Sequence, residues 1–138
     1  MKSIKALLVC AVLLTLCQTG CGEKTSCVSG VVTLDGQPLP DHRVSFTLET
    51  NGVTTGATGL TDANGKYTLT TESGKTGCPI GHFQVRLGWV NPNPPKNVLN
   101  GDPSPYKLPK SAFDGSTTFE VSASGSSEAN FDFHTDSI

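Results

Sequence analysis

The sequence contains few charged residues and few aromatic ones. Charged side chains make up 16% and aromatic ones 7%, including one tryptophan and two tyrosines, whereas an average soluble domain is about 25% charged. After residue 20 no apolar stretch approaches the ~20 residues that a membrane-spanning helix needs. No segment has apolar residues at helical spacing either. These absences exclude a helical bundle and a protein that crosses a membrane repeatedly by helices.

An excess of positive charge is also missing. The chain has 10 basic and 12 acidic side chains, a formal net charge of −2. Removing Lys2 and Lys5 with an export segment leaves 10 − 2 = 8 basic against 12 acidic residues, a balance of −4. Such a surface does not attract phosphates, so we expect no nucleic-acid partner.

Patterns typical of catalytic and metal sites are absent as well. His42, His82 and His134 show no zinc-ligand spacing, and we interpret them as solvated residues on strand faces or in loops. No serine stands in a G-x-S-x-G motif. Asp62 with Asn64-Gly65 is typical of a turn, because the rest of a calcium-binding loop does not follow. We therefore predict that the protein is not an enzyme and has no cofactor or metal site.

The first 20 residues have the pattern of an export signal. Lys2 and Lys5 precede an apolar run over 6–16, which is too short to span a bilayer. The following Gly20-Cys21-Gly22 resembles the site at which a bacterial lipoprotein is acylated and cleaved, although Gln18 departs from the usual aliphatic residue. Cys17 is a poorer alternative acceptor, and an ordinary secretory signal is the other interpretation. We predict a signal peptide over 1–20, lipidation at Cys21 and a short tether over 21–27.

The mature chain alternates apolar and polar residues with the period of two that half-buried strands show. Segments with this alternation are separated by turn residues such as Asn64-Gly65, which suit a tight hairpin turn. About seven short strands with one apolar face each predict an all-β, two-sheet antiparallel sandwich over 28–138. The predicted strands are 28–34, 43–49, 53–61, 66–71, 82–87, 117–122 and 129–134.

A long connection over 91–109 interrupts this pattern. It is rich in proline and asparagine, so it favours neither a helix nor a regular ladder of strands. Connections of this length are often functional. We therefore predict a contact surface here that includes Trp89 and Tyr106, although partial burial of Trp89 in the core is an alternative.

Several motifs of the mature chain, in order, resemble the carboxypeptidase regulatory-like domain of the transthyretin-like sandwich superfamily. The resemblance covers nearly all of the mature chain, and Pro79-Ile80-Gly81-His82-Phe83 departs from the family's Pro-Gly turn by one inserted residue. It implies an Ig-like or transthyretin-like accessory sandwich without catalytic residues. The motifs that carry it are Val28-Ser29-Gly30-Val31-Val32-Thr33-Leu34-Asp35-Gly36-Gln37-Pro38-Leu39-Pro40, Val44-Ser45-Phe46 and Thr61-Asp62-Ala63-Asn64-Gly65-Lys66-Tyr67-Thr68-Leu69.

Two cysteines, Cys27 and Cys78, remain in the mature domain once Cys21 is acylated. In an oxidising compartment they could form a disulfide, which would stabilise the fold by about 4 kcal/mol in the chain-entropy model, or remain two thiols. We expect a non-catalytic binding or structural protein of the cell envelope, held by lipid at the outer membrane or the periplasmic face of the inner membrane. Its partner would be an envelope protein or, as an alternative function, a surface carbohydrate.

Overall fold

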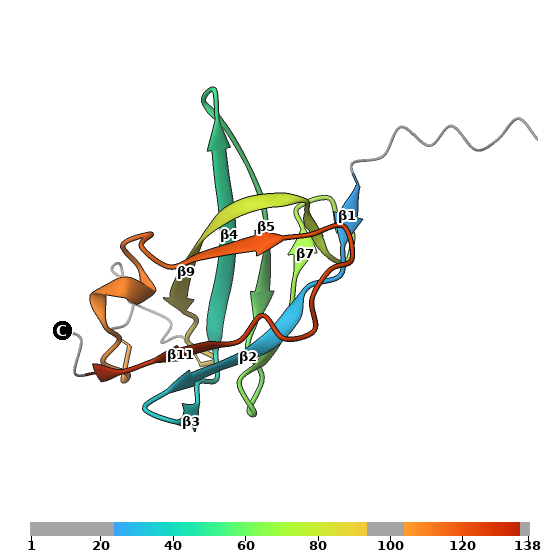
Figure 1. Ribbon diagram of the computed structural model, residues 1–138. Coiled ribbons are helices and arrows are strands. Elements are labelled where there is room, and N and C mark those ends of the chain that lie inside the picture. The colour runs from blue at the N-terminus through green and yellow to red at the C-terminus, as the bar shows by residue number, and fades with distance from the viewer. Residues whose placement is uncertain (1–23, 94–103, 136–138) are drawn as a thin grey trace, which may run out of the picture.

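A computed structural model describes residues 24–93 and 104–135, and this part of the chain is built from strands (Figure 1). It contains no α-helix and one short 3-10 turn, η1 (Lys110–Ala112). The prediction of an all-β protein is therefore confirmed. The strands are β1 (Thr25–Ser26), β2 (Ser29–Leu34), β3 (Gln37–Pro38), β4 (His42–Thr50), β5 (Val53–Leu60), β6 (Lys66–Thr68), β7 (Thr70–Thr71), β8 (Cys78–Pro79), β9 (Gly81–Trp89), β10 (Thr118–Val121) and β11 (Phe131–Phe133).

The larger sheet has five antiparallel strands in the order β10-β9-β4-β5-β7. Its central strands alternate as the sequence predicts, since Val44 and Phe46 of β4 are buried, as are Phe83 and Val85 of β9. This alternation sends one face of the sheet into the core and the other into solvent.

A long hairpin joins β4 to β5 and projects beyond the rest of the molecule (Figure 1). Its tip is Asn51-Gly52, with φ angles of 53° and 77°. Two successive positive φ angles are what a two-residue hairpin turn requires, and Asn-Gly is the favoured pair. The same dipeptide at 64–65 forms a different turn, in which the Asp62 carboxylate accepts hydrogen bonds from the backbone of Asn64 and Lys66, at 2.8 and 3.0 Å.

The second sheet has the order β11-β2-β3, with β6 also paired to β2. Unlike the other strand pairs in the described structure, β11 runs parallel to β2. The connection over 122–130 explains this direction, because it carries the chain from the edge of the first sheet along β2 before β11 begins. Ser126 and Ala129 form backbone hydrogen bonds with Ser29 on the way, at 2.9 and 3.0 Å.

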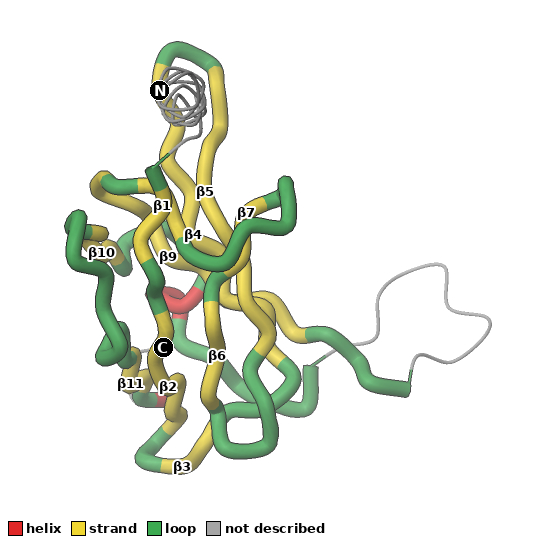
Figure 2. Tube along the Cα trace, turned by 90° about the vertical axis from the view of Figure 1, so that its right-hand side faces the viewer, coloured by secondary structure: helices red, strands yellow, loops and turns green. Residues whose placement is uncertain are grey.

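The predicted strand over 66–71 is divided in the structure into two short strands, one in each of the two larger sheets. Its first part, β6, lies beside β2 (Figure 2), whereas β7 pairs with β5. Between them Leu69 is fully buried, and its backbone N–H donates to Val28 at 2.9 Å. The expected hairpin with 53–61 is thus correct only for β7, because the chain changes sheets at Leu69.

One core lies between the two sheets. Phe46 of β4 has its ring centroid 6.2 Å from that of Phe83 and 6.1 Å from that of Phe131 on β11. Tyr67 of β6 is also buried there, and its hydroxyl donates to the Ala129 carbonyl at 2.5 Å. These contacts tie strands from both sheets into one packed unit.

Candidate contact surface

Trp89 and Tyr106 lie at one end of the larger sheet, each beside His42. The first residue of β4, His42, is the cross-strand partner of Trp89, the last residue of β9. The Tyr106 ring meets the imidazole edge-on, with centroids 5.3 Å apart and planes at 72°. Trp89 and Tyr106 are half-buried. We term His42, Trp89 and Tyr106 the aromatic end.

His42 is fully buried, so the interpretation of this histidine as a solvated residue was wrong. Its ring Nδ1 lies 2.7 Å from the Pro40 carbonyl oxygen, which can only accept, so Nδ1 carries the proton. The other ring nitrogen, Nε2, is buried without a hydrogen-bond partner. Burial lowers the pKa of His42, because a charged ring would lose its hydration there. The sequence contains a signal for this burial. His42 lies two residues before Val44, so in an alternating strand both side chains point to the same, inward face.

The other two histidines are exposed, as predicted. His82 faces Glu120 across β9 and β10, with 4.0 Å between Nδ1 and the nearer carboxylate oxygen. His134 lies 3.2 Å from the Asp132 carboxylate and 3.8 Å from that of Asp35. In the described parts of the chain, no group of three or more His, Cys, Asp or Glu side chains is placed to hold a metal ion.

The loop that carries Tyr106 is described only at its two ends, 91–93 and 104–109. The Asn91 side chain accepts from the backbone of Asn93 at 2.8 Å, and the Ser104 hydroxyl accepts from the backbone of Tyr106 at 3.1 Å. Pro109 is fully buried and leads into η1. The rest of the predicted contact loop, 94–103, lies outside the described residues.

The structure contains no disulfide between Cys27 and Cys78. Cys78 is fully buried and lies opposite Ser26, not Cys27, in the pairing of β1 with β8. Neighbouring residues of an extended chain point to opposite sides, and Cys27 is accordingly exposed. The two side chains therefore point apart, which is incompatible with disulfide geometry.

The predicted lipidation site, Cys21, and the signal peptide lie outside the described residues. In the described residues no helix is long and apolar enough to cross a membrane.

The solvent face of the larger sheet is polar. It presents Arg43 and Ser45 from β4 and His82, Gln84 and Arg86 from β9. No tryptophan, tyrosine or phenylalanine of the described β4 or β9 residues stands at these outward positions. Sugar rings bind by stacking on aromatic side chains, so this face offers them no such platform.

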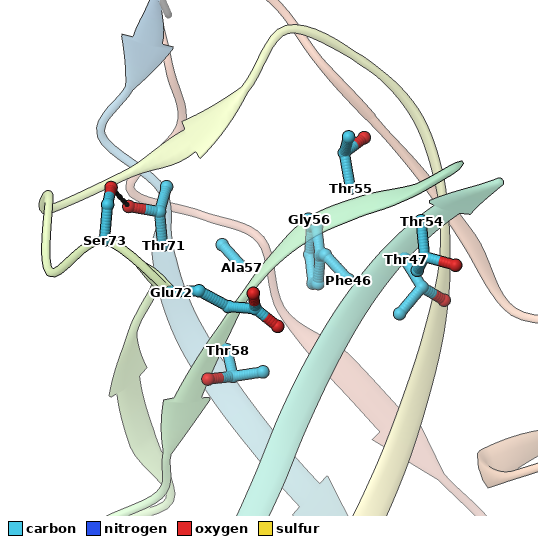
Figure 3. A pocket seen from close by; sticks show the side chains of 10 residues that line it. All are labelled: Phe46, Thr47, Thr54, Thr55, Gly56, Ala57, Thr58, Thr71, Glu72 and Ser73. Carbon is cyan, nitrogen blue, oxygen red and sulfur yellow. Dashed lines mark hydrogen bonds between the residues drawn. The ribbon is translucent and has the colours of Figure 1, made fainter. Parts of the chain in front are cut away.

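A groove of about 290 Å³ runs along β5 near the hairpin (Figure 3). It is lined by residues 54–58 of β5, by Phe46 and Thr47 of β4, and by residues 71–73, which are the end of β7 and the turn that follows it. Glu72 extends from the turn after β7 toward β5, and the Thr71 and Ser73 hydroxyls share a hydrogen bond of 2.9 Å (Figure 3). The weak pattern of 53–61 gave no indication of this groove.

No protein-family model, no curated protein and no solved structure matches the chain.

Proposed function

We propose that the protein is a non-catalytic lipoprotein of the cell envelope, in which a transthyretin-like sandwich acts as a binding or structural module. The export pattern over 1–20 and the acceptor Cys21 support the lipid anchor. The order of the motifs from Val28 to Leu69 supports the assignment of the domain to the transthyretin-like family. The all-β fold, with its two larger sheets packed around one core, supports the sandwich architecture.

The observation that carries the proposal is the distance between the anchor end of the domain and the aromatic end. The described chain enters at β1, which pairs with β8 just before β9 begins at Gly81. Trp89 lies at the other end of β9, which places it roughly 25 Å away at about 3.3 Å per residue. An acylated Cys21 would thus hold β1 at the membrane and leave the aromatic end accessible to envelope proteins.

The polar solvent face favours a protein partner over a carbohydrate. Among the described phenylalanine, tyrosine and tryptophan side chains only Phe113 is exposed, and Trp89 and Tyr106 are half-buried, so a glycan would have little aromatic area to bind. A protein partner can use both the rings and the adjoining backbone.

Photo-crosslinking in intact cells tests the proposal. A photoreactive amino acid replaces Trp89 in one variant and Ser124, an exposed residue close to the β1 end, in the control. We expect the position 89 variant to form a discrete adduct with an envelope protein that the position 124 variant does not form. Identical adducts from both positions, or none from position 89, would refute the aromatic end as the contact surface.

A further inference from the structure

The strand β5 has a free edge over residues 53–56. Its neighbours in the sheet are β4 on one side and β7 on the other. The pairing with β7 covers only Ala57 and Thr58 of β5. Beyond that point the chain turns back, with the Gly74 N–H donating to the Thr71 carbonyl at 2.9 Å. In the described structure no strand pairs with residues 53–56 on this side.

The groove in Figure 3 lies along this free edge. A pocket on one face of a strand is lined by every second residue, because side chains alternate. Here five consecutive residues, 54–58, line the groove, so its wall is the edge of the strand itself. Its volume, about 290 Å³, is at the lower limit for small-molecule sites, roughly 300 Å³. The shape suits an extended backbone better than a compact ligand.

This edge is less protected against pairing with other chains than the other sheet edges are. Charged residues or proline on an edge strand prevent other chains from pairing with it. The edge strands β10, β11 and β3 carry Glu120, Asp132 and Pro38 respectively. The edge strands β1 and β7 carry neither charge nor proline, but each is only two residues long, which also limits pairing. Over its whole length β5 reads VTTGATGL and has neither charge nor proline.

We propose that the free edge of β5 binds an extended segment of a partner protein, which continues the line of β7 as an additional antiparallel strand. Backbone hydrogen bonds to Thr54 and Gly56, whose N–H and C=O groups face away from β4, would provide the affinity. Glu72 is the one charged residue that lines the groove, so the segment carries a lysine or arginine opposite it. A second copy of β5 is a poorer occupant because it would bring no basic residue to Glu72.

Peptide binding to the full chain in detergent micelles tests this proposal independently of the aromatic end. The probes are two fluorescent seven-residue peptides that alternate valine and threonine, one with a central lysine and one with a central glutamate. We expect the lysine peptide to bind about two- to fivefold more tightly, the size of one exposed ion pair. Glu72→Lys should reverse this preference, whereas Glu120→Lys on the opposite edge should leave it unchanged.

A backbone variant tests the strand pairing itself. The N–H of Thr54 faces the free edge, because odd-numbered residues of β5 bond to β4, as the Thr61 N–H does to the His42 carbonyl. Thr54→Pro removes this donor and should abolish binding of both peptides, while Thr54→Ala should retain it. Amide chemical shifts should move at residues 53–56 when the lysine peptide binds. Since Glu72→Lys alters only an exposed side chain, it keeps the test decisive if Thr54→Pro unfolds. Failure of both peptides to bind, equal affinity for the two, shifts confined to other strands, or a dimer of the chain through β5 would overturn the proposal.

Discussion

His42 is the residue whose chemistry depends most on its surroundings. Its ring is fully buried at the start of β4 and donates one hydrogen bond, to Pro40. The buried Nε2 finds no partner in the described structure, which costs about 1–3 kcal/mol for a polar atom. Protonation of Nε2 would add an unpaired charge at this position. The protein therefore keeps this imidazole neutral.

This burial predicts a loss of stability in mild acid. The unfolded imidazole titrates near 6.5, and the folded one has a lower pKa, so below pH 6.5 the unfolded state binds more protons. The free energy of unfolding should be constant above about pH 6.5 and fall as the pH drops from there toward the folded pKa. Urea midpoints between pH 7.5 and 5 measure the slope.

In His42→Phe this contribution of the imidazole should vanish and the slope should become shallower. The control is His82→Gln, which removes an exposed histidine and should keep the slope of the wild type. Equal slopes in His42→Phe and the wild type would show that His42 does not cause the acid sensitivity.

The two cysteines should differ in reactivity. In native protein a maleimide should modify Cys27, which is exposed, and spare Cys78, which is fully buried. After denaturation without reductant both should react, because the structure contains no disulfide between them. Peptide mapping by mass spectrometry identifies the labelled positions, and a peptide pair linked through these two residues would contradict the structure.

At the scale of elements, the contact of β2 with the segment before β11 depends on Gly30. A Cβ atom added at this position would lie 2.0 Å from the Ala129 carbonyl oxygen and 3.1 Å from the Ala129 Cα. Neither atom belongs to a flexible side chain, so the segment over 122–130 would have to shift. That segment leads directly into β11, whose parallel pairing with β2 would shift with it.

Gly30→Ala should therefore lower the free energy of unfolding by about 1–3 kcal/mol or more, as overpacking does. Gly88→Ala is the matched control, because a Cβ at Gly88 meets nothing within 4 Å. It should change stability by less than about 0.5 kcal/mol, as surface substitutions generally do. Urea unfolding compares the two variants, and similar losses in both would exclude the Ala129 contact as the cause.

At the scale of the whole molecule, the proposed anchor decides where the domain resides. Acyl chains on Cys21 should carry the mature protein into the detergent-rich phase of a phase-separating detergent extraction, since each buried CH₂ contributes about 0.8 kcal/mol. Cys21→Ala should move the protein to the aqueous phase, and Cys17→Ala should leave it in the detergent phase. If Cys17→Ala alone releases the protein, Cys17 is the acceptor. If neither variant is released, the anchor is not at these cysteines.

Much of the fold could be predicted because each strand carries its own pattern. The alternation of Val44 and Phe46, and of Phe83 and Val85, correctly predicted β4 and β9 and the faces they bury. Asn51-Gly52 forms the hairpin between β4 and β5, and its signal is present in the sequence although the strand prediction did not use it. The aromatic end was predicted in part, since Trp89 and Tyr106 were named without His42.

The sequence by itself determined the all-β class, the inward side chains and most turns, because these depend on residues a few positions apart. Only the tertiary structure decided the parallel pairing of β11, the change of sheets at Leu69, the separation of Cys27 from Cys78 and the free edge of β5. Backbone hydrogen-bonding groups are nearly identical in every strand. The choice of neighbour therefore depends on how the faces pack together, which local sequence patterns do not encode.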